Sequence, residues 1–212
     1  MTRGVDSEVF HPRHRTCHDG ILRLGFVGRV TPEKGVRLLP RIEQALLDAG
    51  IRNFRIVIIG DGSEWEWLRS NLRTGVFPGV LLGQELAEEY ANLDLFVFPS
   101  RTDTFGNVVQ EAAASGVPAV VTTEGGPQHL IAPGVTGYAE SKDATFVARV
   151  VELAFRREKL REMGEAARKL ASNASWDRAL EAVFEAYRYC QTEQRSAARS
   201  AKLRAVPSAQ VP

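Results

Sequence analysis

The chain has 212 residues, of which 44% are hydrophobic and 25% are charged, and its formal net charge at pH 7 is +1. These are ordinary values for a globular protein with a substantial core. A nearly neutral chain has no general attraction for nucleic acid or an anionic membrane, so any anion site must be local. Two cysteines, Cys17 and Cys190, are too few and too scattered for a disulfide framework or a zinc site, and free thiols suit a reducing cytoplasm.

Residues 1–20 are polar and show no hydrophobic periodicity. His11, His14 and His18 lie in this stretch, but their spacing suits no common metal site and no acid or thiol supports them. We therefore expect a solvated leader and no bound metal.

The first strand is expected at residues 22–27, and a glycine-containing loop follows from Gly28 to Gly35. Arg29 and Lys34 project from this loop at the carboxyl edge of the strand. Two fixed cations that face a helix N-terminus can neutralise a diphosphate without a metal. The alternative is that both are solvated surface charges.

A second strand is expected at residues 54–59, before the turn Gly60-Asp61-Gly62 and a helix from 64 to about 71. A third short strand is expected at residues 80–82 with its exit at Gly83, and a helix from about 86 to 92 follows.

The central unit of the chain runs from residue 95 to residue 121. Residues 95–98 and 119–121 are short apolar runs typical of buried parallel strands, and a helix between them starts at about Asn107. Ligands of such units sit at the carboxyl ends of the strands, where loop amides and helix N-termini converge.

Two acids are placed to use that geometry, Asp103 in the loop and Glu111 just over one turn into the helix. Gly106 lets the backbone come close to a ligand and leaves the first N–H groups of the helix free for an anion. The carboxylates can then accept hydrogen bonds from hydroxyls on either side of that anion, which fits a nucleotide-sugar.

After this unit, residues 134–138 resemble a hairpin-type turn into a last short strand, and three helices are expected from residues 144, 158 and 176. Strands that alternate with helices predict an α/β fold, a Rossmann-like parallel sheet with helices on both faces. No G-x-G-x-x-G follows the first strand, and no G-x-x-x-x-G-K-[ST] or G-x-S-x-G is present. These absences disfavour a dinucleotide oxidoreductase, a nucleotide triphosphatase and a hydrolase.

The central unit resembles the signature of group 1 retaining glycosyltransferases of the GT-B architecture, S-x-x-[ED]-x-F-G-x-x-x-x-E-A-x-A-x-G-x-P. It reads Ser100 to Gly106 and then Glu111 to Pro118 here. The G-R-V-x-x-x-K-G stretch is similar to the diphosphate-binding loop of that family. Many members have Glu where this chain has Asp103 and His129, so the donor sugar is left open.

The resemblance implies that residues 21–190 are the C-terminal, nucleotide-sugar-binding half of a GT-B enzyme. Residues 1–20 would lead in from an N-terminal acceptor domain that this chain lacks. Independently of the resemblance, residues 191–212 are short of large apolar residues, which predicts a disordered tail. The enzyme would transfer a sugar from a UDP- or GDP-sugar to an acceptor hydroxyl, with retention and without a metal or other cofactor.

The resemblance also assigns roles to residues. Arg29 and Lys34 would hold the diphosphate, Glu111 the ribose hydroxyls and Asp103 the donor sugar. The remaining donor contacts implied are Gly28, Gly60, Gly62, Leu82, Gly83, Thr104, Phe105, Gly106, Asn107 and Val108.

The acceptor expected is a lipid or a polysaccharide, and the location is the cytoplasm, with the full-length enzyme peripheral at the inner membrane face. Two other functions remain open: a nucleotide-sugar-binding module without catalysis, and another GT-B enzyme such as a sugar-nucleotide epimerase or a phosphorylase.

Overall fold

The computed structural model describes residues 4–173 together with residues 184 and 188. The expected tail of residues 191–212, and the expected helix from residue 176 apart from those two positions, lie outside the described residues. Within the described part, no helix is both long enough and apolar enough to cross a membrane.

The centre of the molecule is a six-stranded sheet with the order β3-β2-β1-β4-β5-β6. All neighbouring strands pair in parallel. The strands are β1 (Leu22–Val27), β2 (Phe54–Ile59), β3 (Gly75–Gly79), β4 (Leu95–Phe98), β5 (Ala119–Thr122) and β6 (Gly137–Glu140). The predicted Rossmann-like fold is confirmed.

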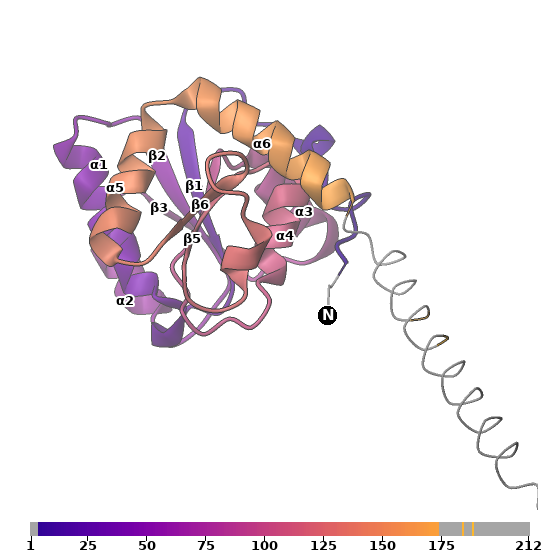
Figure 1. The fold of residues 1–212 in the computed structure, drawn as a ribbon. Coiled ribbons are helices and arrows are strands. Elements are labelled where there is room, and N and C mark those ends of the chain that lie inside the picture. The colour runs from indigo at the N-terminus through magenta and orange to yellow at the C-terminus, as the bar shows by residue number, and fades with distance from the viewer. Residues whose placement is uncertain (1–3, 174–183, 185–187, 189–212) are drawn as a thin grey trace, which may run out of the picture.

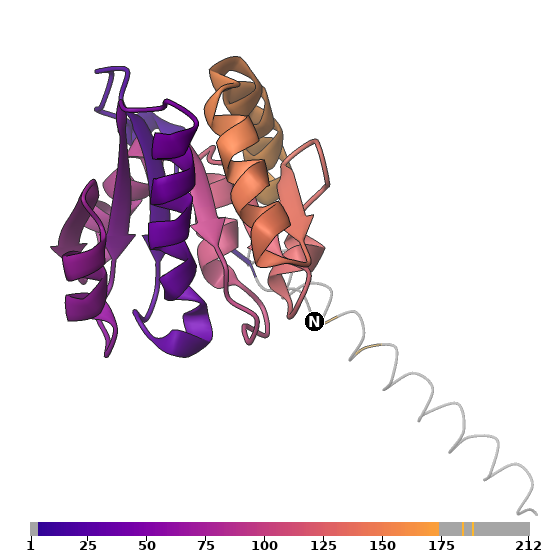
Figure 2. The same ribbon diagram turned by 90° about the vertical axis from the view of Figure 1, so that its left-hand side faces the viewer.

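Helices cover both faces of this sheet. They are α1 (Leu39–Asp48), α2 (Trp65–Asn71), α3 (Gly83–Asn92), α4 (Asn107–Ala114), α5 (Asp143–Ala154) and α6 (Arg157–Ser172). Figure 1 shows α1, α2 and α5 on one side of the sheet and α3, α4 and α6 on the other. In Figure 2 α1 and α5 lie side by side in front of the strands. Short 3-10 turns complete the fold: η1 (Pro12–His14), η2 (Pro32–Lys34), η3 (Val36–Leu38) and η4 (Pro127–Leu130).

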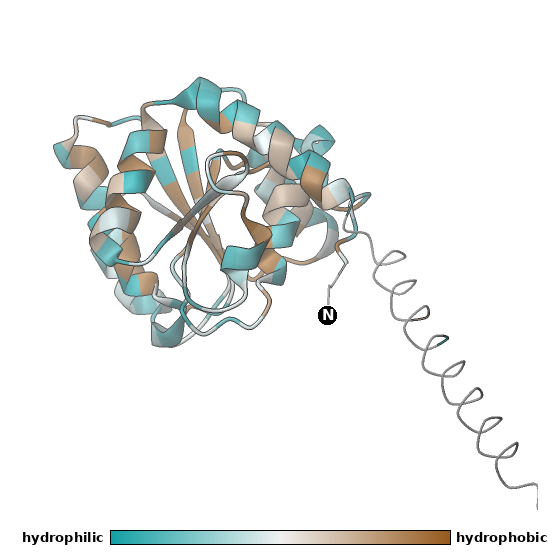
Figure 3. Ribbon diagram, in the orientation of Figure 1, coloured by the Kyte–Doolittle hydropathy of each residue, from teal (hydrophilic) through white to brown (hydrophobic). Residues whose placement is uncertain are grey.

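The core lies between the sheet and these two helical layers. Every residue of β4 and β5 is buried, because helices cover both faces of the inner strands. The same separation is visible in Figure 3, where hydrophobic strands run through the middle and hydrophilic residues lie on the outer helix faces. On α1 the buried apolar residues Leu39, Ile42 and Leu46 recur at helical spacing, as an amphipathic helix requires.

Two expectations about the strands are wrong. The third strand is β3 at Gly75–Gly79, not residues 80–82, which form the loop into a helix that already begins at Gly83. β3 is an edge strand with alternating exposure and contains Pro78, so its sequence lacks the apolar run that marks the inner strands. β6 pairs in parallel with β5, so the turn before it is not a hairpin.

The N-terminal segment is anchored to the domain, which corrects the expectation of a solvated leader. The buried Asn92 side chain accepts hydrogen bonds from the backbone N–H groups of Thr16 and Cys17, at 2.9 and 2.8 Å. Arg168 donates to the carbonyls of Ser7 and Phe10, both at 3.0 Å. Val5 and Phe10 also pack on the core, but they stand alone in a polar stretch, so sequence periodicity does not reveal the anchoring.

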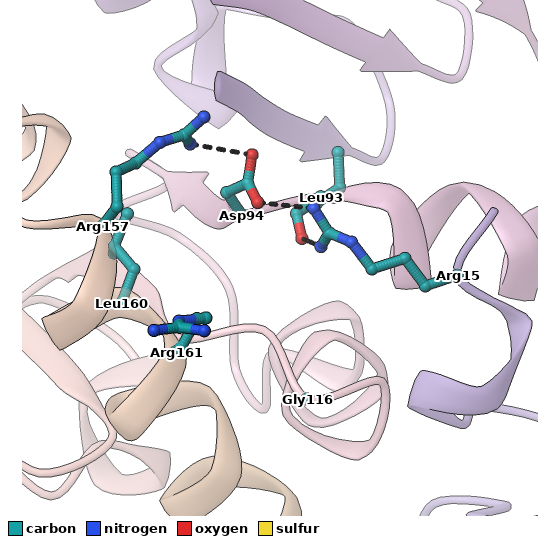
Figure 4. A pocket seen from close by; sticks show the side chains of 7 residues that line it. All are labelled: Arg15, Leu93, Asp94, Gly116, Arg157, Leu160 and Arg161. Atoms are coloured by element: carbon teal, nitrogen blue, oxygen red, sulfur yellow. Dashed lines mark hydrogen bonds and ion pairs between the residues drawn. The ribbon is translucent and has the colours of Figure 1, made fainter. Parts of the chain in front are cut away.

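Asp94, at the amino-terminal ends of the strands, also holds the N-terminal segment in place. Its carboxylate pairs with Arg15 of the N-terminal segment at 2.7 Å and with Arg157 at the start of α6 at 3.0 Å, as Figure 4 shows. It also accepts the backbone N–H of Arg23 at the start of β1. Asp94 therefore joins three separate parts of the chain.

We predict that Asn92→Ala lowers the free energy of unfolding of this chain by about 1–3 kcal/mol, because it leaves two backbone N–H groups without their acceptor. Urea denaturation measures the change. Asn92→Asp keeps a side-chain oxygen acceptor and should lose less. A freely solvated leader would instead give both variants a stability within ~0.5 kcal/mol of the wild type.

Candidate functional site

The site lies where the order of the strands reverses. From β1 the chain continues toward β2, whereas from β4 it continues toward β5, so the loops after these two neighbouring strands diverge. Ligands of open α/β sheets bind in the crevice at this point. A cavity of about 320 Å³ opens there. It is lined by Val27, Gly28, Lys34, Phe98, Asp103, Thr104, Phe105, Gly106, Asn107 and Val108.

An ion pair spans the cavity from one loop to the other. The Lys34 ammonium lies 2.5 Å from a carboxylate oxygen of Asp103, and the side chains are 12% and 22% exposed. The Lys34 ammonium also lies 6.0 Å from the centre of the Phe98 ring. The cation is therefore held at the base of the cavity, between the segments that follow β1 and β4.

The N-terminus of α4 opens onto the same cavity. Gly106 precedes the helix with φ 74° and ψ 48°, and no side chain caps the helix. A Cβ at Gly106 would lie 2.8 Å from Pro127, so both the backbone conformation and the close approach require glycine. An uncapped helix start offers N–H groups and a partial positive charge to an anion.

The loop that carries Asp103 is fixed from behind by Gly125 and Gly126. The Gly126 N–H donates to the Asp103 carbonyl at 2.8 Å, and a Cβ at either glycine would collide with a carbonyl of Asp103 or Thr104. This glycine pair therefore supports the acid loop directly.

A second cavity of about 250 Å³ adjoins the first, since Val27 and Gly28 line both. Its remaining lining residues are Arg29, Ile59, Gly60, Asp61, Val80 and Leu81. Most of these are apolar. Arg29 is 73% exposed on its side chain, and its nearest acid is Glu33 at 3.7 Å.

The structure thus separates the two cations that the sequence places together. Lys34 is half-buried in the first cavity, whereas Arg29 is exposed at the rim of the second. Gly60 lies in the second cavity, where a Cβ would collide with the Gly28 carbonyl. Gly62 packs against the Val30 carbonyl in the same way, outside both cavities.

Leu82 and Gly83 line neither cavity. Leu82 is 75% exposed, and Gly83 is the first residue of α3. Val80 and Leu81 line the second cavity in place of Leu82 and Gly83. The two predicted residues are displaced because the third strand was expected at residues 80–82 and lies at Gly75–Gly79. Phe98 also lines the first cavity, and the sequence analysis did not predict this. An apolar residue at the end of a buried strand looks the same in the sequence whether it faces a cavity or the core.

Glu111 lies one turn below the mouth of α4, four residues after the cavity-lining Asn107 and so on the same helix face. It is half-buried, and the Tyr90 hydroxyl donates to one carboxylate oxygen at 2.9 Å. Burial raises the pKa of Glu111 above its ordinary value, and the bond from Tyr90 opposes part of that rise. Glu111 lines neither cavity, and its Oε2 faces the buried Tyr90 hydroxyl.

Two other cavities are weaker candidates. The one at Asp94 lies at the opposite edge of the sheet, and its Arg15 and Arg157 guanidiniums are already paired with that acid (Figure 4). The other, about 450 Å³, contains Arg41 and Arg101, which pair with Asp143. Among the described residues, no group of three His, Cys, Asp or Glu side chains is arranged to hold a metal ion.

Comparison with known proteins identifies relatives of this chain. The family model "Glycosyl transferases group 1" matches residues 22–155. A GDP-mannose-dependent alpha-mannosyltransferase of Corynebacterium glutamicum is 43% identical over 143 residues, which cover 64% of this chain and 33% of the relative. The chain spans between a third and a half of the length of the first three curated relatives it matches.

Solved structures share the fold. Sucrose-phosphate synthase from Thermosynechococcus elongatus superposes with a TM-score of 0.76 at 22% identity, over 90% of this chain and 52% of that one. The C-terminal domain of the group 1 glycosyl transferase LpcC from Francisella tularensis superposes with a TM-score of 0.66 at 20% identity, over 80% of this chain and 97% of that one. The family match covers more than half of the chain and includes both loops of the first cavity, and the chain therefore belongs to the group 1 glycosyl transferase family.

Proposed function

We propose that this chain is the C-terminal, donor-binding half of a glycosyltransferase that moves a sugar from a nucleoside-diphosphate sugar to an acceptor hydroxyl, with retention and without a metal. The observation that carries the proposal is the first cavity, where the Lys34 ammonium, the uncapped start of α4 and the Asp103 carboxylate converge. The near-complete coverage of the isolated LpcC domain supports the assignment to the C-terminal half.

The two adjoining cavities fit the parts of such a donor. The diphosphate lies between Lys34 and the start of α4, and the sugar reaches Asp103. The base enters the apolar second cavity beside Val80 and Leu81, while the exposed Arg29 turns toward the phosphates. Glu111 receives the ribose hydroxyls from the helix face below Asn107.

This placement gives the residues their roles in the reaction. The bond between the anomeric carbon and the terminal phosphate oxygen breaks, the acceptor oxygen bonds to that carbon, and the proton of the acceptor hydroxyl passes to the departing nucleoside diphosphate, on which negative charge grows. Lys34 and the N–H groups of α4 are fixed where that charge develops, which is where electrostatic stabilisation lowers a barrier most. Because a side-chain cation and a helix dipole supply positive charge, no metal is required in the proposal.

The donor proposed is GDP-mannose or a related UDP- or GDP-sugar. GDP-mannose is supported by the name of the Corynebacterium glutamicum relative. That name specifies an alpha product, and the sugar of GDP-mannose is itself alpha-linked, so the comparison also supports retention. The lipid or polysaccharide acceptor, the acceptor domain and the cytoplasmic location stay predictions.

We predict that Lys34→Met weakens GDP binding about 10- to 100-fold, which corresponds to one lost hydrogen bond to a charged group. Arg29→Met should cost about fivefold at most, because its side chain is exposed to solvent. Calorimetric titration with GDP and with UDP measures both effects. Arg41→Met, which removes an exposed arginine outside the two cavities, is the control. Unchanged affinity in a folded Lys34→Met variant would refute the diphosphate assignment.

Asp103→Asn should affect binding of the sugar part of the donor but not binding of its nucleotide part. The wild-type carboxylate neutralises Lys34 in the free protein, so its removal should leave GDP binding unchanged or strengthen it a few-fold. The additional affinity for GDP-mannose over GDP should disappear, because the acceptor for the sugar hydroxyls is lost. The ratio of the two dissociation constants is the measurement. A variant that loses GDP affinity but keeps the wild-type ratio would argue against this role.

A further inference from the structure

Tyr90 is a buried polar residue that the reaction described above does not use. It lies on α3, is fully buried, and its ring contacts Phe96 of β4 and Phe10 of the N-terminal segment at centroid distances of 5.8 and 5.6 Å. Its hydroxyl donates to Oε2 of Glu111 at 2.9 Å. A phenol packed on several sides has little freedom to move, so this hydroxyl is a fixed point in the core.

The acid that receives this bond needs such a fixed point. Glu111 has three rotatable side-chain bonds and is half-buried on α4, a helix of eight residues. Within the described part of the chain, Tyr90 is the one side chain that hydrogen-bonds to it. One carboxylate oxygen is thereby held toward the core. The other oxygen, and the second lone pair of the first, are left for a ligand.

We propose that Tyr90 is a positioning residue that orients the Glu111 carboxylate toward the ribose hydroxyls, and so sets the selectivity of the site for ribonucleotides over deoxyribonucleotides. The inference rests on the proposed function, since it requires a nucleotide in the two cavities. It assigns to a residue of α3, outside the cavity lining, part of the recognition of the donor.

The alternative is a purely structural bond, in which Glu111 merely satisfies a buried hydroxyl. The two differ in a measurable way. A structural bond affects stability alone, whereas an orienting bond also affects how strongly the site distinguishes a ribose from a sugar that lacks its hydroxyls.

The test compares GDP with 2′,3′-dideoxy-GDP by calorimetry. Wild-type chain should bind GDP at least about tenfold more tightly, the effect of one hydrogen bond to a charged group. Tyr90→Phe keeps the ring contacts and removes only the hydroxyl. It should weaken GDP binding about tenfold, leave dideoxy-GDP binding unchanged, and bring the ratio of dissociation constants close to one.

Thr74→Val is a matched control. The Thr74 hydroxyl donates to the buried Glu43 carboxylate at 2.6 Å, at the opposite edge of the sheet. This variant loses the same kind of bond and should be less stable, but it should keep the wild-type ratio. In a Glu111→Gln background, Tyr90→Phe should have no further effect on the ratio.

Glu111→Asp provides a second route if Tyr90→Phe does not fold. An acid shorter by one methylene should not reach both the tyrosine and the ribose, so the ratio should fall. If a folded Tyr90→Phe variant, or Glu111→Asp, keeps the wild-type ratio of the two dissociation constants, the inference about Tyr90 is wrong and the proposed function is unaffected. A wild-type chain that binds no nucleoside diphosphate would overturn the inference and the proposed function together.

Discussion

The ion pair between Lys34 and Asp103 is the contact on which the site depends. Its partners are 69 residues apart in the chain, and they come from the loops that follow β1 and β4, the two strands at which the sheet order reverses. Each charge would be costly alone in a half-buried position, so the pair holds both in the free protein. A ligand with a phosphate at one end and hydroxyls at the other can replace each partner with an equivalent one.

Around that pair, the sequence achieves rigidity mainly through backbone contacts. The acid loop is supported by Gly125 and Gly126, and the loop after β1 packs on Gly60 where a side chain would collide with a carbonyl. The loops are therefore fixed by close approach of main chain to main chain.

The inner strands could be predicted well from sequence and the edge strand could not. β1 and β2 begin and end where predicted, because burial on both faces gives each strand a run of four buried apolar residues. β3 has one face open to solvent, so its pattern is weak and the apolar residues 80–82 were mistaken for it. The N-terminal segment was missed for a related reason: Asn92 and Arg168 hold it through carbonyls and N–H groups, which leave no periodic signal.

In the candidate site, too, some features could be predicted from the sequence and others could not. Residue types and motif spacing indicated Lys34, Asp103 and the start of α4, since chemistry fixes those choices. They did not indicate that Lys34 and Asp103 pair with each other, that Arg29 lies in a neighbouring cavity, or that Tyr90 contacts Glu111. Such contacts join residues distant in the chain, and only the packing of helices on the sheet brings them together.

The composition of β3 has a consequence for association between molecules. An open sheet edge is a template on which another chain can add a strand and start aggregation. β3 is short, it contains Pro78, which has no N–H to offer, and a glycine stands at each of its ends. This edge is therefore a poor surface for recruiting a further strand from another molecule.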